Sequence, residues 1–139
     1  MSGEQPAAGR TAVTPFVAAM HFEVAEAGGS RVTGHVDLGP DQHTPWGVVH
    51  GGAYCSVVES AASIGASRAV QDHGQFAVGV NNNTDFIRSM TSGRVDVVAE
   101  PIQQGRTQQL WQVLLTRADD GALVARGQVR LQNVPLPSA

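Results

Sequence analysis

The sequence predicts an α+β protein in which an antiparallel six-stranded sheet wraps around one long central helix. Two patterns support this prediction. Residues 31–38 and 123–132 alternate apolar with polar side chains, which is typical of half-buried strands. Residues 51–72 instead repeat apolar side chains every three or four positions, which is typical of an amphipathic helix. The length of 139 residues suits one domain.

Two strands are expected before the helix. The elements in order are a strand over 21–27, a turn at 27–30, a strand over 31–38, a loop over 39–49 and the helix over 51–72. His73 and Gly74 end the helix, because glycine is typical of the position just after a helix. The apolar stripe of this helix consists of Tyr54, Val57, Val58, Ala61, Ile64 and Gly65.

Four strands are expected after the helix. They lie over 76–88, around 94–100, around 111–115 and over 123–132, with turns at 89–93, 103–106 and 119–121. Phe76, Val78 and Val80 alternate in the first of these strands. We expect a flexible N-terminal segment over 1–12 and one domain over 13–139. Because edge strands leave backbone groups unpaired, we also expect dimerisation through a sheet edge.

Composition excludes several classes of protein. The nine basic residues are all arginine and the net charge is −3, which argues against a nucleic-acid-binding protein. A single cysteine excludes a disulfide framework and a cysteine-rich zinc site. The five histidines show no metal-ligand spacing, so we expect no metal. Neither a membrane-spanning stretch nor a secretory signal is evident, so we expect a cytoplasmic protein without a membrane partner.

The start of the helix is a candidate oxyanion site. Gly51 and Gly52 let a ligand approach the backbone closely. The first N–H groups of a helix lack internal partners, and the helix dipole adds positive potential. His50 immediately precedes them. The alternative is structural: the glycines permit a tight turn, and a lone histidine is more often structural than catalytic.

Glu59 is the other candidate. It is the only carboxylate between Gly51 and Arg68, and the other residues of this segment are small or apolar. It can act as a base or nucleophile, with Ser63 one turn away to hydrogen-bond it or a water. The alternative is a solvated helix face. Because Gly51 and Glu59 lie about 12 Å apart along the axis, one carbonyl group cannot contact both in the same helix. A site that uses both therefore needs two subunits with antiparallel helices.

These motifs resemble the hotdog-fold acyl-CoA thioesterases, in particular the PaaI-like branch that hydrolyses hydroxybenzoyl-CoA and dihydroxynaphthoyl-CoA. The likeness covers about residues 22–134. The residues that carry it are Gly47-Val48-Val49-His50-Gly51-Gly52, Val58-Glu59-Ser60-Ala61, Ser63, Asn83, Asp85–Ser89, Gly93–Val95, Gly105-Arg106, Gln109, Trp111-Gln112 and Asp120-Gly121. The resemblance implies hydrolysis of an acyl-CoA, with an aromatic or aryl-like acyl group favoured, to free acid and CoA. It implies no cofactor, and a homodimer or a dimer of dimers.

The resemblance also implies roles for single residues. Glu59 would be the nucleophile or the base acting on water, and the Gly51 N–H would polarise the thioester carbonyl. His50 would orient the thioester, and Ser63 would support the attacking group. Thr44 stands where this branch often has a glutamine that positions the thioester, and Gln42 is the substitute available nearby.

Further residues are expected to bind substrate. By the resemblance, three arginines at turns or strand ends would contact the CoA phosphates through paired donors. The alternative for each of them is an ordinary solubilising surface residue. The candidate substrate-binding residues are Thr44, Trp46, Gly52, Arg88, Ser89, Arg94 and Arg106. Trp46 and Phe86 flank candidate site segments and could line an acyl pocket, but core packing is the preferred interpretation of both, and Cys55 is interpreted as a small helix residue. Two other functions stay open: an acyl-thioester hydratase or dehydratase, and a non-catalytic acyl-CoA-binding protein.

Overall fold

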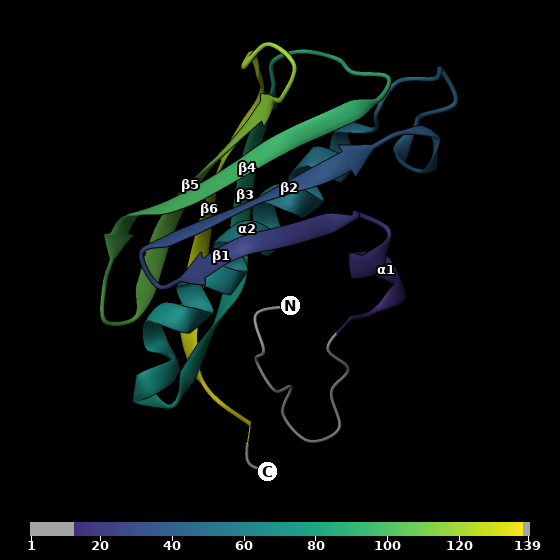
Figure 1. Cartoon of the computed structure of the whole chain (residues 1–139). Helices are drawn as coiled ribbons and strands as arrows, with labels where there is room; N and C mark the ends of the chain where they lie inside the picture. The colour runs from purple at the N-terminus through teal and green to yellow at the C-terminus, as the bar shows by residue number, and fades with distance from the viewer. Residues whose placement is uncertain (1–12, 138–139) are drawn as a thin grey trace.

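Helix α2 (Gly51–Val70) lies in the concave face of a curved six-stranded antiparallel sheet (Figure 1). The computed structural model describes residues 13–137, so the expected flexible segment over 1–12 lies outside the described residues. The remaining elements are α1 (Pro15–Ala18), β1 (Phe22–Gly28), β2 (Arg31–Leu38), η1 (Pro40–Gln42), η2 (Gln71–His73), β3 (Gln75–Phe86), β4 (Gly93–Gln104), β5 (Gln108–Arg117) and β6 (Leu123–Pro135). The predicted fold class is confirmed.

The strands follow the order β1-β2-β4-β5-β6-β3, which leaves β1 and β3 at the two edges. The chain crosses from β2 through α2 to β3, which pairs with β6 at the far side of the sheet. None of the helices among residues 13–137 is long and apolar enough to cross a membrane.

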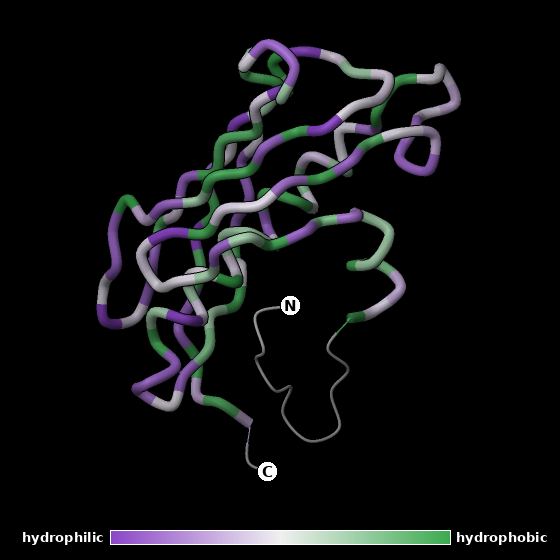
Figure 2. Tube along the Cα trace, viewed as in Figure 1, coloured by the Kyte–Doolittle hydropathy of each residue, from purple (hydrophilic) through white to green (hydrophobic). Residues whose placement is uncertain are grey.

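The core lies between α2 and the concave face of the sheet. Hydrophobic and hydrophilic residues alternate along the strands (Figure 2), so each strand can turn one set toward this core. The predicted helix stripe is buried except for Ile64, which is half-buried, while Ala62 and Ala66 join the buried set. Trp111 on β5 is fully buried and packs against α2 at Gly65, where a Cβ would lie 2.3 Å from the indole ring. The small residues of α2 therefore let the large side chains of the sheet approach the helix axis.

Strand β3 differs from the pattern that its sequence suggests. Val78 and Val80 lie on the outer face, 41% and 55% exposed, whereas Ala77 and Gly79 face the helix side. A bulge at Val80 shifts the register with β6 between Gly79 and Asn81. Because one extra residue reverses the alternation of a strand, the inward positions continue at Asn82 rather than Asn81.

Three short elements were not foreseen: α1, the 3-10 turn η1 within the predicted loop 39–49, and η2. Helix α1 begins at Pro15, and the hydroxyl of Thr14 accepts a hydrogen bond from the Val17 amide at 3.3 Å. The predicted helix over 51–72 is α-helical only to Val70, after which the chain tightens into η2. Gly74 then turns the chain with φ +71°, a conformation that glycine adopts without steric strain.

Candidate functional site

The N-terminal end of α2 is closed by His50. The imidazole Nδ1 accepts a hydrogen bond from the Gly52 amide at 2.8 Å, and the His50 amide donates to the Gln42 carbonyl at 2.7 Å. Because Nδ1 is the acceptor, the proton of the neutral ring lies on Nε2. The exposed His50 side chain therefore presents an N–H donor beside the helix end.

The Gly51 amide is the free donor of this helix end. Among residues 13–137 no acceptor pairs with it, whereas the next amide is taken by His50. A Cβ at Gly51 would lie 2.4 Å from the ring of Phe86, so the phenyl ring lies directly against this backbone. Phe86 is 53% exposed, and its ring centroid lies 5.8 Å from that of the buried Tyr54 with the rings tilted by 44°. It therefore lines the surface beside Gly51 and is not a core residue.

Glu59 points toward β3 and is half-buried, so it does not belong to a solvated helix face. Its Oε1 accepts a hydrogen bond from Asn82 Nδ2 at 3.1 Å, and a Cβ at Gly79 would lie 2.2 Å from Oε2. Ser63 is half-buried one turn further on, and no hydrogen bond in the described part of the chain joins it to Glu59. Asn82 was missed by sequence reasoning.

Gly51 and Glu59 do not meet within one chain. Eight residues of helix separate them, about 12 Å along the axis, which a glutamate side chain does not span. A carboxylate and a polarising N–H are the two groups needed to attack a carbonyl and to stabilise its oxyanion. Each chain therefore holds both groups, but at different places on the same helix.

The loop before the helix is stabilised by its own side chains. The Thr44 hydroxyl accepts a hydrogen bond from the Trp46 amide at 3.2 Å, and the Thr44 amide donates to the Val48 carbonyl at 2.7 Å. Gln42 is buried, accepting from Gly39 N–H at 2.9 Å and donating to a backbone carbonyl of the α1 segment at 2.8 Å. Both ends of this amide are therefore occupied. Trp46 is 91% exposed, so core packing is wrong for it.

The candidate arginines differ in their surroundings. Arg88 donates through Nη1 to the Leu123 carbonyl at 2.6 Å, and Arg94 pairs with Asp96 at 3.1 Å. The guanidinium of Arg106 has no hydrogen bond or ion pair to any residue in the described range 13–137. Arg106 is thus the candidate whose guanidinium is free to bind an anion.

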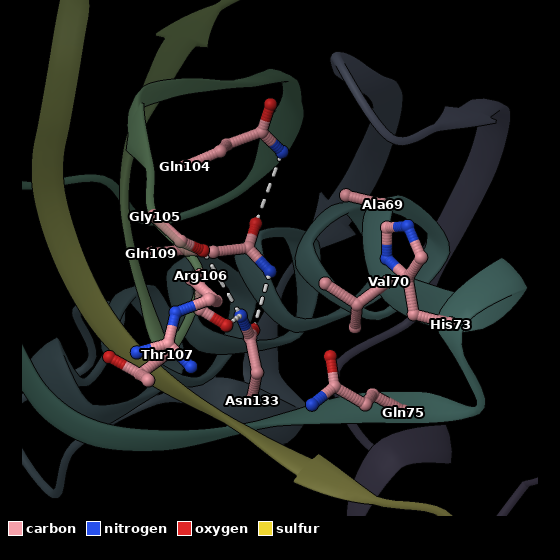
Figure 3. A pocket seen from close by; sticks show the side chains of 10 residues that line it. All are labelled: Ala69, Val70, His73, Gln75, Gln104, Gly105, Arg106, Thr107, Gln109 and Asn133. Atoms are coloured by element: carbon pink, nitrogen blue, oxygen red, sulfur yellow. Dashed lines mark hydrogen bonds between the residues drawn. The ribbon is translucent and has the colours of Figure 1, made fainter.

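Arg106 lines a cavity of about 550 Å³ at the C-terminal end of α2 (Figure 3). No Asp or Glu lines this cavity, and His73 lies opposite Arg106. By contrast, Ser89 lines a cavity of about 450 Å³ together with Arg117, Asp119 and Asp120, and the guanidinium of Arg117 is already paired with Asp120 at 2.8 Å.

Side-chain amides fix the turn that carries Arg106. Gln109 is 1% exposed and donates to Asn133 at 2.8 Å, and the Asn133 amide donates to the Gly105 and Arg106 carbonyls at 3.3 and 3.2 Å (Figure 3). The sequence signal for this network is weak. Gln109 falls on the same strand face as Trp111, and only that alternation marks it as buried.

A third cavity adjoins the N-terminal end of α2. It measures about 380 Å³, and its lining includes apolar Phe16, Met20 and Ala53, polar Asp41, His43 and Ser56, and also His50 and Gly52. Within residues 13–137 no group of three or more His, Cys, Asp or Glu side chains could hold a metal ion.

Comparisons with known proteins agree with this geometry. Residues 47–124 match the family model described as "Thioesterase superfamily". The chain is 47% identical over 122 residues, 86% of both chains, to a Mycobacterium tuberculosis H37Rv protein named "Putative esterase Rv1847". The structure of that protein matches with a TM-score of 0.84 at 45% identity, covering 90% of this chain and all of the other.

Two further relatives carry more specific names. The chain is 34% identical over 74 residues to the 1,4-dihydroxy-2-naphthoyl-CoA hydrolase of Listeria monocytogenes, covering 53% of this chain and 59% of that protein. The structure of thioesterase HI1161 from Haemophilus influenzae matches with a TM-score of 0.80 at 25% identity, covering 88% of this chain and 85% of the other.

Proposed function

The chain belongs to the thioesterase superfamily and is a thioester hydrolase, and we propose that its substrate is an acyl-CoA with an aromatic or aryl-like acyl group. The observation that carries the proposal is the pair of groups on α2: the unpaired Gly51 N–H and the Glu59 carboxylate held against β3. The naphthoyl-CoA hydrolase among the relatives supports the aromatic preference.

In the proposed reaction the carboxylate of Glu59 acts at the thioester carbonyl carbon. It either attacks that carbon itself, forming a mixed anhydride that water then hydrolyses, or removes a proton from the water that attacks. In both routes the C–S bond breaks, the sulfur leaves as CoA thiolate and takes up a proton, and the free acid is released. The Gly51 N–H donates to the oxyanion that forms on the carbonyl oxygen.

His50 and Ser63 assist in this proposal. The Nε2–H of a neutral His50 is a second donor beside Gly51 and orients the thioester oxygen. Ser63, one helical turn beyond Glu59, supports the attacking group or the water. The proposal calls for neither a metal nor a cofactor, because residues of the chain supply the carboxylate and the oxyanion donors, and CoA is itself part of the substrate.

The proposed site is shared between two subunits. Because about 12 Å of helix separates Gly51 from Glu59, the site combines Gly51 of one copy with Glu59 of another. The edge strand β3 carries the exposed Val78 and Val80, which suits pairing with a second copy. A homodimer is then the smallest active unit, and a dimer of dimers is the larger assembly that we propose.

We assign the acyl and nucleotide ends of the substrate to opposite ends of α2. Exposed Trp46 and Phe86, with Gly52 in the lining of the nearby cavity, offer apolar surface to an aryl group. The Arg106 cavity offers a free guanidinium to a phosphate of CoA. We also propose that four further residues contact the substrate: Thr44, Arg88, Ser89 and Arg94. Some of their polar groups are already hydrogen-bonded within the chain.

The test is thiol release from benzoyl-CoA and an aliphatic acyl-CoA by the wild-type protein, Glu59→Gln and the control Glu23→Gln. Glu23 is exposed on β1. Glu59→Gln should lose at least the 10²–10⁴-fold of acid–base catalysis, whereas the control keeps its activity. Unchanged activity in Glu59→Gln contradicts the mechanism. A changed double bond without thiol release indicates a hydratase or dehydratase, and binding without turnover indicates an acyl-CoA-binding protein.

Two arms test the other parts of the proposal. Arg106→Ala should raise KM for benzoyl-CoA but not for the benzoyl thioester of pantetheine, which lacks the nucleotide. Mixing inactive Gly51→Val and Glu59→Gln subunits should restore activity, because a mixed dimer holds one intact shared site. Full activity in a monomer would contradict the shared site. We also propose a cytoplasmic location, because CoA thioesters are made there.

A further inference from the structure

We propose that Asn82 is a positioning residue that fixes the orientation of the Glu59 carboxylate for the reaction. This inference rests on the proposed role of Glu59 and adds a residue outside the expected site. Asn82 lies on β3, and its Nδ2 donates to Glu59 Oε1 at 3.1 Å and to the Cys55 carbonyl at 3.0 Å. Both hydrogens of the amide are therefore used, one on the carboxylate and one on the preceding turn of α2.

The amide of Asn82 is itself held in one orientation. The Thr84 hydroxyl donates to Asn82 Oδ1 at 2.6 Å. If the amide were flipped, its oxygen would face the Glu59 carboxylate and the Cys55 carbonyl, which are both acceptors. The chain of hydrogen bonds therefore runs in one direction, from Thr84 through Asn82 to Glu59.

The contact leaves one carboxylate oxygen available. Among residues 13–137, Glu59 Oε2 has no hydrogen-bond partner, while Oε1 is taken by Asn82. Gly79 closes the space on the other side, because a Cβ there would lie 2.2 Å from Oε2. The carboxylate is thus confined between the strand backbone and the amide, with a defined oxygen left to act on the carbonyl carbon or the water.

The bulge at Val80 selects which of three consecutive asparagines takes this role. Asn82 pairs with Val129 of β6, which is fully buried, so position 82 faces the helix. Asn81 and Asn83 are exposed on the outer face. Asn81→Ala is therefore a matched control, with the same chemical change one residue away and no contact with the site.

The test measures kcat and KM for thiol release from benzoyl-CoA. Loss of a hydrogen bond to a charged group predicts that Asn82→Ala lowers kcat about 10- to 100-fold. KM and the unfolding temperature should stay close to wild type, and Asn81→Ala should change neither constant. Thr84→Val should also lower kcat, whereas Thr84→Ser, which keeps the hydroxyl, should keep it.

A double variant distinguishes a positioning role of Thr84 and Asn82 from a general loss of structure. If Thr84 acts only through Asn82, then Thr84→Val should have no further effect on kcat in the Asn82→Ala background. Additive losses would overturn the proposal, and so would a kcat for Asn82→Ala within twofold of wild type. Should Asn82→Ala fail to fold, equal kcat values for Thr84→Val and Thr84→Ser would overturn it instead. Full activity of Glu59→Gln would refute the proposed function itself, whatever the asparagine variants do.

Discussion

Replacing Gly79 by alanine should lower kcat without lowering the stability of the fold. The new Cβ would lie 2.2 Å from Glu59 Oε2 and 3.0 Å from Cδ, so the carboxylate must retreat by about 1 Å to reach ordinary contact. That movement stretches or breaks the 3.1 Å hydrogen bond from Asn82. A misplacement of about 1 Å can cost about 10²-fold in rate, and we expect a loss of kcat of this size.

Stability should not fall in the same variant. Gly79 does not have a positive φ, so alanine fits its backbone, and the clashing atoms are the far end of a side chain. Alanine also reduces the freedom of the unfolded chain, which contributes about 0.4–1 kcal/mol. The assay pairs thiol release from benzoyl-CoA with thermal unfolding. Gly28→Ala is the control, because its Cβ would make only an ordinary 3.5 Å contact. A kcat within threefold of wild type, with the fold intact, would refute the reasoning.

Three other variants test the core, the hairpin and the amide network. Gly65→Ala should lower the free energy of unfolding by about 1–3 kcal/mol in thermal unfolding, because its Cβ would lie 2.3 Å from the Trp111 ring. Arg117 lowers the pKa of Asp120 below the ordinary 3.8 by a hydrogen bond, so this pair stabilises the fold above that pH and its contribution is lost as the pH falls. Asp120→Asn should therefore flatten the acid side of a plot of unfolding temperature against pH, and an unchanged slope would contradict this. Gln109→Leu leaves the buried Trp111 N–H without its 2.9 Å partner and should cost about 1–3 kcal/mol in urea unfolding.

The fold could be predicted from local sequence patterns because buried residues recur regularly on the concave face of the sheet. Val113 and Leu115 alternate with less buried residues on β5, and the small residues of α2 recur with the helix period. Each pattern depends only on neighbours in the sequence, so the sequence suffices to detect it. The order of the strands and the edge position of β3 depend on pairing between distant segments, which alternation does not encode.

The site was less predictable for the same reason. Glu59 was found because a lone carboxylate in an apolar helix stands out, but its partner Asn82 depends on a bulge. Core packing was the preferred interpretation of Trp46, yet this residue lies on an exposed turn. The Thr44 hydroxyl and the Gln42 amide are occupied by backbone groups that are close only in the folded loop. Hydrogen bonds between a side chain and nearby backbone groups leave no periodic signal in a sequence.

The bulge at Val80 also makes β3 sensitive to changes in length. Without the bulge, regular alternation from Gly79 onward would turn Asn81, Asn83 and Asp85 toward the helix in place of Asn82 and Thr84. The acidic group of Asp85 would then face the helix that carries Glu59. Inserting one residue between Asn81 and Asn82 should likewise turn Asn83 and Asp85 inward and abolish activity in one step, whereas deleting Val80 removes the bulge, keeps Asn82 opposite Val129 and should preserve the site.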